Sequence, residues 1–402
     1  MSRRWTIGLT VFGLALSPLS ANAQESRSFA DRLALEPIQW EFDNTEIRLG
    51  GNAGGALYTA SQEGGPGFPD GYENSGASAL LTGNIRVQRT FDTGLVLGAR
   101  GDVLIYRDRL SGDNYDNDTV QRLYMFLQTG FGRVEVGQVD GAAYTLGLTG
   151  PIVDQNVTLE GHNISLFRNP TTGETFRDLF QQITTVQISS NYAKISYTTP
   201  RLFGIQLGAA YTPQAVRTPL PFTGNPSDDP NKQRAIWEVA ASYTGYFSGW
   251  AVGVAGGFAH GRLMNRTPGH DNLVDWAIGT QLAHNIDDAK ISFGVAYRGS
   301  NAHLLDIEDV RDDSRSRMVH LSAAFEKPLW LVGVEFSHAD LDGVDAFTIN
   351  GFQAAAGYKV NANMQLSIGW QYRDYNRSAG AFYNGRSGIN MNAAFLSLGY
   401  TL

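Results

Sequence analysis

A period of two residues dominates this sequence. From 364 to 373, Met, Leu, Ile, Trp and Tyr alternate with Gln, Ser, Gly, Gln and Arg, and the stretches 276–283, 290–298 and 330–337 repeat the pattern. Successive side chains of a β-strand point to opposite faces, so each stretch predicts a strand with one apolar and one polar face. Many apolar rows begin or end with Trp, Tyr or Phe, which is typical of strands that cross both interfaces of a membrane.

The lengths of the connections separate a membrane barrel from a soluble sandwich, because both alternate apolar and polar residues. Short connections alternate along the chain with long polar ones that are rich in Gly and Asp. The short ones are 91–94, 130–131, 246–248, 285–289, 327–328 and 360–362, and the long ones are 61–76, 111–118, 213–232, 306–316 and 376–387. A barrel with tight turns at one end and long loops at the other has this rhythm, and a Greek-key sandwich does not.

Sixteen strands are predicted between residue 46 and the end of the chain. Their spans are 46–59, 78–91, 95–108, 119–130, 132–139, 185–199, 204–212, 235–246, 248–262, 273–285, 289–301, 315–327, 329–340, 347–360, 363–375 and 389–402. With an even number, the first and last strands can pair and remove the edges that lipid cannot hydrogen-bond. The predicted fold is therefore all-β, a transmembrane antiparallel β-barrel of 16 strands without a second domain. Phase slips in the fourteenth and sixteenth strands indicate β-bulges there.

The first residues have the features of a cleaved signal peptide. Arg3 and Arg4 precede an apolar run, 5–16, and Ala21-Asn22-Ala23 fits the small-x-small cleavage pattern. The run is too short to span the ~30 Å hydrocarbon core of a bilayer. We therefore expect residues 1–23 to be removed during export to the outer membrane of a Gram-negative bacterium, and residues 24–45 to form a periplasmic N-terminal segment.

Composition excludes several other functions. The chain has no cysteine, which excludes disulfides, thiolate metal sites and cysteine nucleophiles. Removing the two signal-peptide arginines from 31 basic residues leaves 29 against 39 acidic ones, a formal charge of −10, which argues against a nucleic-acid partner. Neither a His-Glu-x-x-His nor a Gly-x-Ser-x-Gly motif occurs, so no catalytic or metal-binding residue is predicted.

One external stretch is rich in oxygen ligands. Asp113, Asp116 and Asp118 could hold Ca²⁺ or Mg²⁺, but the stretch lacks the Gly and the closing Glu of an EF-hand loop. An ordinary solvated loop without a cofactor is therefore favoured, and a cation bridge to lipopolysaccharide is the alternative.

The long connection from about 140 to 182 breaks the loop pattern. It has more than forty residues without alternation, and loops of this length are commonly functional. Its acidic residues are Asp154, Glu160, Glu174 and Asp178.

The residues before this connection resemble a known family. The stretch 122–138, Arg-Leu-Tyr-Met-Phe-Leu-Gln-Thr-Gly-Phe-Gly-Arg-Val-Glu-Val-Gly-Gln, resembles the strand pair before the third loop of Gram-negative general diffusion porins, with two spacings one residue shorter. The stretch 189–212 is similar to the strand pair after that loop. The terminal Leu-Ser-Leu-Gly-Tyr-Thr-Leu, 396–402, resembles the family's assembly signal but ends in Leu where the family usually has Phe.

The resemblance implies a third loop folded into the lumen, with its acidic residues facing a row of arginines on the barrel wall. Alternation supplies candidates for that row, because it turns the following residues inward: Arg86, Arg100 with Asp102, Arg122, Tyr124 and Lys194. The alternative is that the arginines only solvate a wet interior. The four loop acids cannot be ranked, because the family's loop-tip turn is absent.

The resemblance also implies a homotrimer joined through the early strands and the last one. On the first strand Gly51, Ala53 and Gly55 lie in the outward row and expose little apolar surface to lipid. We expect this strip to face another subunit, and strand flexibility conferred by glycine is the alternative explanation.

The sequence thus predicts a porin, a non-enzymatic, water-filled outer-membrane channel for passive diffusion of small hydrophilic solutes and ions, in contact with membrane lipid and lipopolysaccharide. A substrate-selective channel of the sugar or anion type is an alternative. It would require aromatic residues along the lumen, where Gly, Ser, Gln and charged residues prevail. An outer-membrane hydrolase would require a Ser/His pair at the wall, and the sequence offers none that is compelling. A soluble all-β binding protein is the last alternative.

Overall fold

The computed structural model describes residues 38–63, 72–108, 110–111, 120–160, 164–168, 175–176, 183–189, 192–215, 232–263, 268–302, 310, 312–342, 346–377 and 388–402. The predicted signal peptide, 1–23, lies outside these residues, as do Asp113, Asp116 and Asp118.

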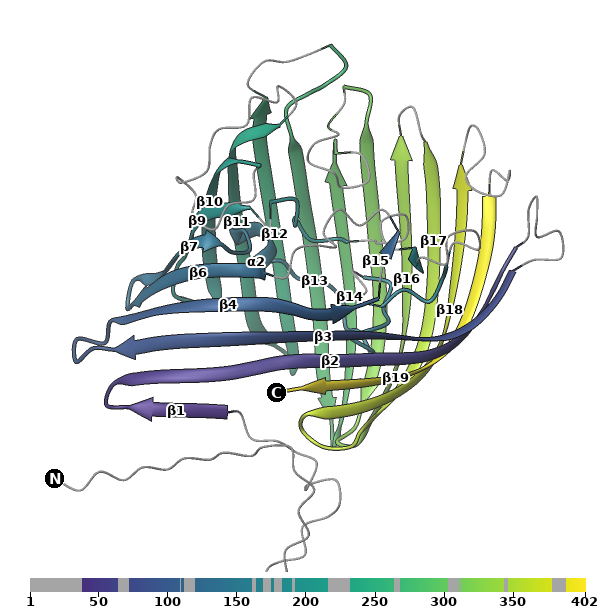
Figure 1. Ribbon diagram of the computed structural model, residues 1–402, viewed down its shortest axis with the longest axis horizontal. Coiled ribbons are helices and arrows are strands. Elements are labelled where there is room, and N and C mark those ends of the chain that lie inside the picture. The colour runs from purple at the N-terminus through teal and green to yellow at the C-terminus, as the bar shows by residue number, and fades with distance from the viewer. Residues whose placement is uncertain are drawn as a thin grey trace, which may run out of the picture.

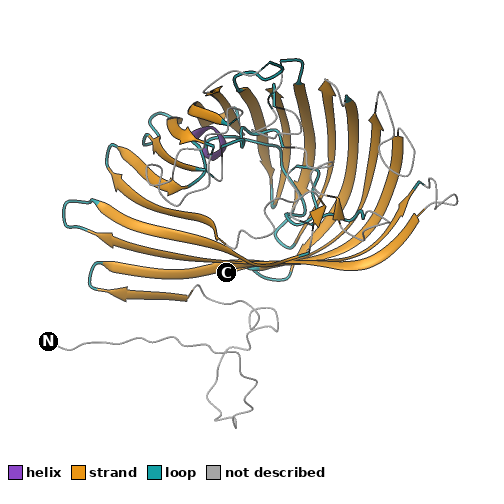
Figure 2. Cartoon of the chain, turned by 45° about the horizontal axis from the view of Figure 1, so that its top comes forward, coloured by secondary structure: helices purple, strands orange, loops and turns teal. Residues whose placement is uncertain are grey.

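Sixteen long strands, each antiparallel to its neighbours, make up the wall of the protein (Figure 1). They are β2 Thr45–Gln62, β3 Tyr72–Thr90, β4 Val96–Arg107, β6 Val120–Thr129, β7 Gly132–Gln138, β9 Ala193–Thr198, β10 Ile205–Gln214, β11 Gln233–Phe247, β12 Trp250–Leu263, β13 Val274–Ile286, β14 Ala289–Ser300, β15 Arg315–Glu326, β16 Trp330–Asp342, β17 Phe347–Lys359, β18 Met364–Arg377 and β19 Gly388–Thr401. β19 pairs with β2, from Met391 opposite Gln62 to Thr401 opposite Asn52. This pairing closes the sheet into the predicted barrel, whose strands curve around a common space in Figure 2.

Besides β1, described below, three short elements of the described residues lie outside this ring of strands. β5 (Leu110–Ser111) and β8 (Thr175–Phe176) form a small parallel pair, and α2 (Ala142–Thr145) is a single helical turn after β7. Within the described residues no helix has the length and apolar character needed to cross a membrane.

The predicted strand spans agree with the structure to within a few residues, with two larger errors. The strand predicted as 78–91 begins at Tyr72, inside the connection predicted for 61–76. The span 185–199 was predicted as strand, but β9 begins only at Ala193. The residues before it do not alternate, because Thr185, Val186, Ile188 and Ser189 are all buried. Residues 183–189 are therefore packed on both sides instead of forming a wall strand.

A strand that was not predicted lies inside the expected periplasmic segment. β1 (Ile38–Phe42) forms a hairpin with the first residues of β2, through a turn in which Asp43 has φ of 51°. β19 does not reach this part of β2, because the C-terminal Leu402 already meets Gly51, to whose carbonyl its N–H donates at 2.9 Å. β1 therefore pairs with an edge that would otherwise stay open.

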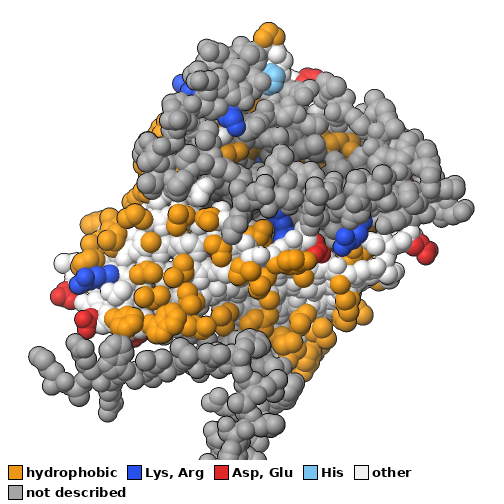
Figure 3. Space-filling view, viewed as in Figure 1, with side chains coloured by type: hydrophobic (Ala, Val, Ile, Leu, Met, Phe, Trp, Pro, Cys, Tyr) orange, Lys and Arg blue, Asp and Glu red, His pale blue; other side chains and the backbone are white. Residues whose placement is uncertain are grey.

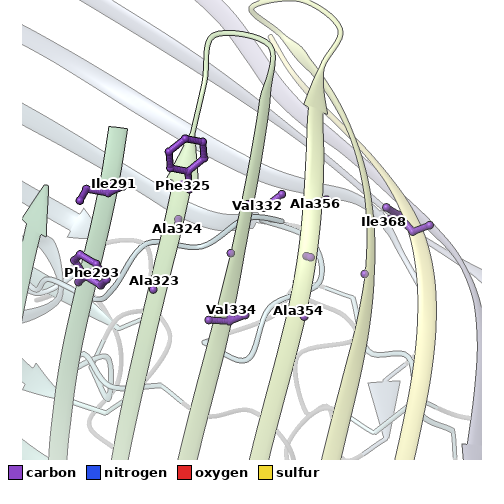
Figure 4. A pocket seen from close by; sticks show the side chains of 13 residues that line it. Ile291, Phe293, Ala323, Ala324, Phe325, Val332, Val334, Ala354, Ala356 and Ile368 are labelled. Carbon is purple, nitrogen blue, oxygen red and sulfur yellow. The ribbon is translucent and has the colours of Figure 1, made fainter. Parts of the chain in front are cut away.

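The two faces of the wall differ as the alternation predicts. Outward side chains are apolar and exposed, for example Leu57 on β2 and Phe293 on β14, with exposed fractions of 60% and 47%. Figure 3 shows hydrophobic side chains over the strands of the visible face and charged ones near the turns. On β14–β18 the outward face is hollowed into an apolar groove, where Ala323, Ala354 and Ala356 lie between larger residues such as Phe293 and Ile368 (Figure 4).

The predicted bulges in the fourteenth and sixteenth strands are wrong. The registers of β17 and β19 run without a break, and the shifts lie instead between β3 and β4, β4 and β6, and β11 and β12. The phase slips in the sequence come from apolar side chains on the inward row. Phe347 of β17 and Met391 of β19 are buried in one cluster with Leu166 and Phe167 of the long connection.

The two faces of β3 allow a test of the barrel. Ile85 lies on the outward row, and Asn84 lies on the inward row opposite Asp102. We expect Ile85→Lys to lower the free energy of unfolding from lipid vesicles by roughly 2–4 kcal/mol if this position lies near the bilayer midplane, because the ammonium would enter hydrocarbon. Asn84→Lys, the matched control, should change it little. Chemical denaturation in vesicles measures both values, and equal losses would contradict the assignment of the faces.

Candidate functional site

The predicted wall residues lie in one row across adjacent strands. Arg48 of β2 is opposite Arg86 of β3, which is opposite Arg100 of β4, which is opposite Tyr124 of β6. The row continues through Gly137 of β7 to Lys194 of β9. The structure therefore brings four of the five wall candidates into one row, and the fifth, Arg122, lies two residues along β6 on the same face. We call Arg48, Arg86, Arg100, Arg122, Tyr124 and Lys194 the wall row.

Carboxylates beside the wall row hold two of its arginines. The Arg100 Nε donates to Asp102 Oδ1 at 2.8 Å. Arg122 lies between two acids, 3.3 Å from the Asp102 carboxylate and 2.7 Å from that of Asp140. These pairs fix the guanidinium groups in place, since charge-assisted hydrogen bonds are the stronger ones.

Arg86 has a different environment. Its guanidinium carbon lies 5.0 Å from the centroid of the Phe126 ring, and that of Arg133 lies 3.9 Å from the same ring. Arg133 is paired with Glu135 at 2.7 Å, whereas in the described part of the chain no carboxylate lies within ion-pair distance of Arg86. Phe126 stabilises both cations through its π face, and Arg86, unlike Arg100 and Arg122, is not paired with a carboxylate of the described residues.

Lys194 is enclosed by protein and does not face an open space. Its side chain is completely buried, and Nζ donates to the carbonyl oxygens of Val139, at 2.8 Å, and of Ser189. These two residues lie near the start and the end of the connection between β7 and β9. Lys194 therefore holds the two ends of this connection together. We call residues 139–192 the long segment.

Inward side chains of β16–β19 bind the backbone and side chains of the long segment. Glu335 accepts hydrogen bonds from Thr158 Oγ1 at 2.5 Å and from the Leu159 N–H at 3.1 Å. Gln353 donates to the Val157 carbonyl at 2.7 Å, and Gln365 donates to the Val153 carbonyl at 2.8 Å. The buried rows of these strands are thus paired with the long segment.

The two predicted loop acids that the structure describes, Asp154 and Glu160, do not pair with the arginines of the wall row. Asp154 is buried and accepts hydrogen bonds from the N–H groups of Asn156 and Val157, both at 2.8 Å, so it stabilises its own turn. Glu160 accepts from the Thr184 N–H at 2.7 Å and from its hydroxyl at 2.9 Å. Burial raises the pKa of Glu160 above its ordinary value. Glu174 and Asp178 lie outside the described residues.

The acids that do pair with the arginines were only partly foreseen. Asp102 was predicted to face inward but not to bind Arg100 and Arg122, and Asp140 was not selected at all. Asp140 lies two residues after the end of β7, and β7 is two strands from β4, which carries Asp102. This position could have identified Asp140 as a partner of Arg122. Pairing between strands far apart in sequence has no local signal, so only the barrel register brings these groups together.

The remaining candidates lie where alternation places them. Gly51, Ala53 and Gly55 share the outward row of β2 with Leu57, while Tyr58 on the other face is buried. No three His, Cys, Asp or Glu residues of the described chain come close enough together to hold a metal ion.

Comparison with known proteins agrees with this geometry. A sequence model described as Gram-negative porin matches residues 9–378. No curated protein matches the chain.

Solved outer-membrane proteins share the fold. The Salmonella typhi OmpF complex with daunomycin has a TM-score of 0.55 at 13% identity, over 90% of this chain and 100% of that one. The anion-selective porin from Comamonas acidovorans has a TM-score of 0.54 at 11% identity, over 89% and 100%. The trimer form of OmpT from Vibrio cholerae has a TM-score of 0.52 at 14% identity, over 90% and 100%. At such identities the likeness concerns the fold, and the family follows from the sequence match.

With that match across most of its length, a closed barrel and a charged inward face, the chain belongs to the Gram-negative porin family, and its function is that of an outer-membrane channel for small hydrophilic solutes and ions.

Proposed function

We propose that the protein is a passive, non-enzymatic diffusion channel whose narrowest part lies between the long segment and the wall row. The observation that carries this proposal is that the long segment lies against inward side chains of β16–β19, while among the described residues only Asp140, at its start, reaches the arginines of β3, β4 and β6. A 16-stranded barrel is wide enough for an aqueous lumen, and a chain along its inner wall narrows that lumen.

The two sides of the proposed constriction lie at similar distances from the short turns. Arg100 is four residues into β4, counted from Val96, and Arg86 is four residues from Thr90 at the end of β3. On the other side, Gly294 is five residues into β14, counted from Ala289, and it abuts Gly150 of the long segment. This agreement supports a single constriction built from both sides.

The charges of the constriction are interleaved instead of opposed. Asp102 of β4 and Asp140 at the start of the long segment both lie among the arginines, and each carboxylate is within 3.3 Å of a guanidinium group. Arg86 then dominates the local field. Charged groups at a narrow point orient dipolar solutes and disfavour apolar ones, which suits a general channel for polar molecules.

The ion preference of the channel should depend on Arg122. Arg122→Ala removes the guanidinium group that lies 2.7 Å from Asp140, and it leaves Asp102 paired with Arg100 alone. The net charge at the constriction therefore becomes more negative. We expect the reversal potential in a KCl gradient across a planar bilayer to shift toward cation selectivity. Arg201→Ala removes the same charge at the short turn between β9 and β10 and should leave the reversal potential nearly unchanged. No shift in Arg122→Ala would contradict the role of the wall row.

We also propose a homotrimer in which the small outward residues of β2 face another subunit. A flat strip of Gly51, Ala53 and Gly55 permits close approach of two walls, and the Vibrio cholerae OmpT neighbour is described in a trimer form. Small residues at a helix interface in membranes act in the same way, by allowing backbones to come near.

Substitution on this strip tests the trimer. Ala53→Trp should reduce the trimeric fraction strongly, because the indole would hold the two walls apart. Ala241→Trp, outward on β11 on another part of the wall, should leave it intact. Light scattering of the detergent-solubilised protein gives the molar mass. A monomeric wild type, or a trimer unaffected by Ala53→Trp, would exclude this interface.

Export to the outer membrane completes the proposal. Residues 1–23 have the composition of a signal peptide, so the protein isolated from outer membranes should begin at Gln24. Intact-mass measurement decides this, and a chain that retains Met1 would contradict it.

A further inference from the structure

We propose that a track of inward glycines fixes the long segment against the barrel wall and thereby sets the bore of the channel. The track consists of Gly257 on β12, Gly279 on β13, Gly294 on β14, Gly333 on β16 and Gly54 on β2. The inference rests on the proposed function, since a bore matters only if the lumen conducts.

Each glycine of the track touches the long segment so closely that a methyl group would not fit. A Cβ at Gly257 would lie 2.9 Å from the Cβ of Ala143, and one at Gly333 would lie 2.7 Å from Val153 Cγ2. A Cβ at Gly279 would overlap the carbonyl oxygen of Leu148. Likewise, Gly294 abuts the backbone of Gly150, and Gly54 abuts the side-chain amide of Asn156.

The order of these contacts follows the wall. The long segment meets the strands in the order of the wall: residue 143 lies against β12, 148 against β13, 150 against β14, 153 against β16 and 156 against β2. β19 lies between β16 and β2, and there the side-chain amide of Asn156 donates to the Leu398 carbonyl at 3.3 Å. A chain that crossed the lumen freely would touch two opposite strands. Residues 143–156 instead follow the circumference of the wall in the direction of the strand order.

Outward glycines do not show such contacts. At Gly256, next to Gly257 on β12, the nearest atom to an added Cβ is the Ala277 carbonyl oxygen at 3.6 Å, and at Gly55 it is the Ser78 carbonyl oxygen at 3.8 Å. Where an outward glycine is tightly enclosed, as Gly51 is by the Thr82 carbonyl oxygen at 2.5 Å, the neighbour belongs to the adjacent strand. Contact with the long segment is therefore a property of the inward glycines.

Polar and apolar contacts hold the segment on the track. The bonds from Gln365 and Gln353 to the carbonyl oxygens of Val153 and Val157 fix its backbone between the glycines. Farther along, Val157 and Leu166 are buried with wall residues such as Phe347. Because packed interiors transmit strain instead of absorbing it, a methyl group on the track would push the segment toward the lumen.

The decisive measurement is single-channel conductance in planar bilayers, together with the size of polyethylene glycol that enters the pore. Gly279→Ala and Gly294→Ala meet backbone atoms, so the segment must move as a whole. We expect roughly 1.5-fold lower conductance and a smaller polymer cut-off, because conductance follows the narrowest cross-section. Gly256→Ala, the matched outward control, should conduct like the wild type.

A reciprocal exchange guards against loss of folding. Gly257→Ala introduces one methyl group against Ala143, and Ala143→Gly in the same chain removes the opposing one. The single variant should reduce conductance and the double variant should restore it. Folded variants with unchanged conductance and polymer cut-off would overturn the glycine track while leaving the channel itself intact. A wild-type protein that is electrically silent would instead refute the proposed function.

Discussion

The absence of hydrogen-bonding partners in hydrocarbon governs this structure. A backbone N–H or C=O group left unpaired in lipid costs several kcal/mol, so a sheet can cross a membrane only when its edges are joined. Here β19 completes the ring on β2 by a long antiparallel pairing, and β1 continues along the part of β2 that lies beyond the C-terminus. Closure in turn forces every wall residue to face either lipid or the barrel axis. The functional side chains are those that the pleat turns inward.

The inward face of the wall has two kinds of surface. On β3, β4 and β6 it carries arginines with carboxylates between them, and Phe126 supports Arg86 and Arg133. On β16–β18 it carries amides and Glu335, whose hydrogen bonds satisfy the irregular backbone of the long segment. Without such partners the segment would leave polar groups unpaired, because its described residues form little regular structure of their own.

Apolar residues on the inward face belong to the part of the wall that packs against the long segment. Phe347 and Met391 would be out of place beside water, but they are buried against Leu166 and Phe167. The inward face is therefore not polar throughout, and the position of its apolar residues marks where the long segment packs. An interruption of alternation in a barrel sequence can thus record a covering segment as well as a bulge.

Alternation over ten residues and the rhythm of short and long connections were enough to predict the all-β barrel and its sixteen strands. Alternation also predicted that four side chains point inward, those of Arg86, Arg100, Arg122 and Tyr124. Both signals can be read from the sequence because strand period and turn length are local properties. The family resemblance carried by 122–138 agrees with the sequence match. The sequence could not show that Asp140 pairs with Arg122, that Lys194 binds both ends of the long segment, or that residues 183–189 are packed outside the wall. Those facts depend on contacts between strands and segments far apart in the chain. Only closure of the barrel, which sets the register of every strand against the next, brings these groups within bonding distance.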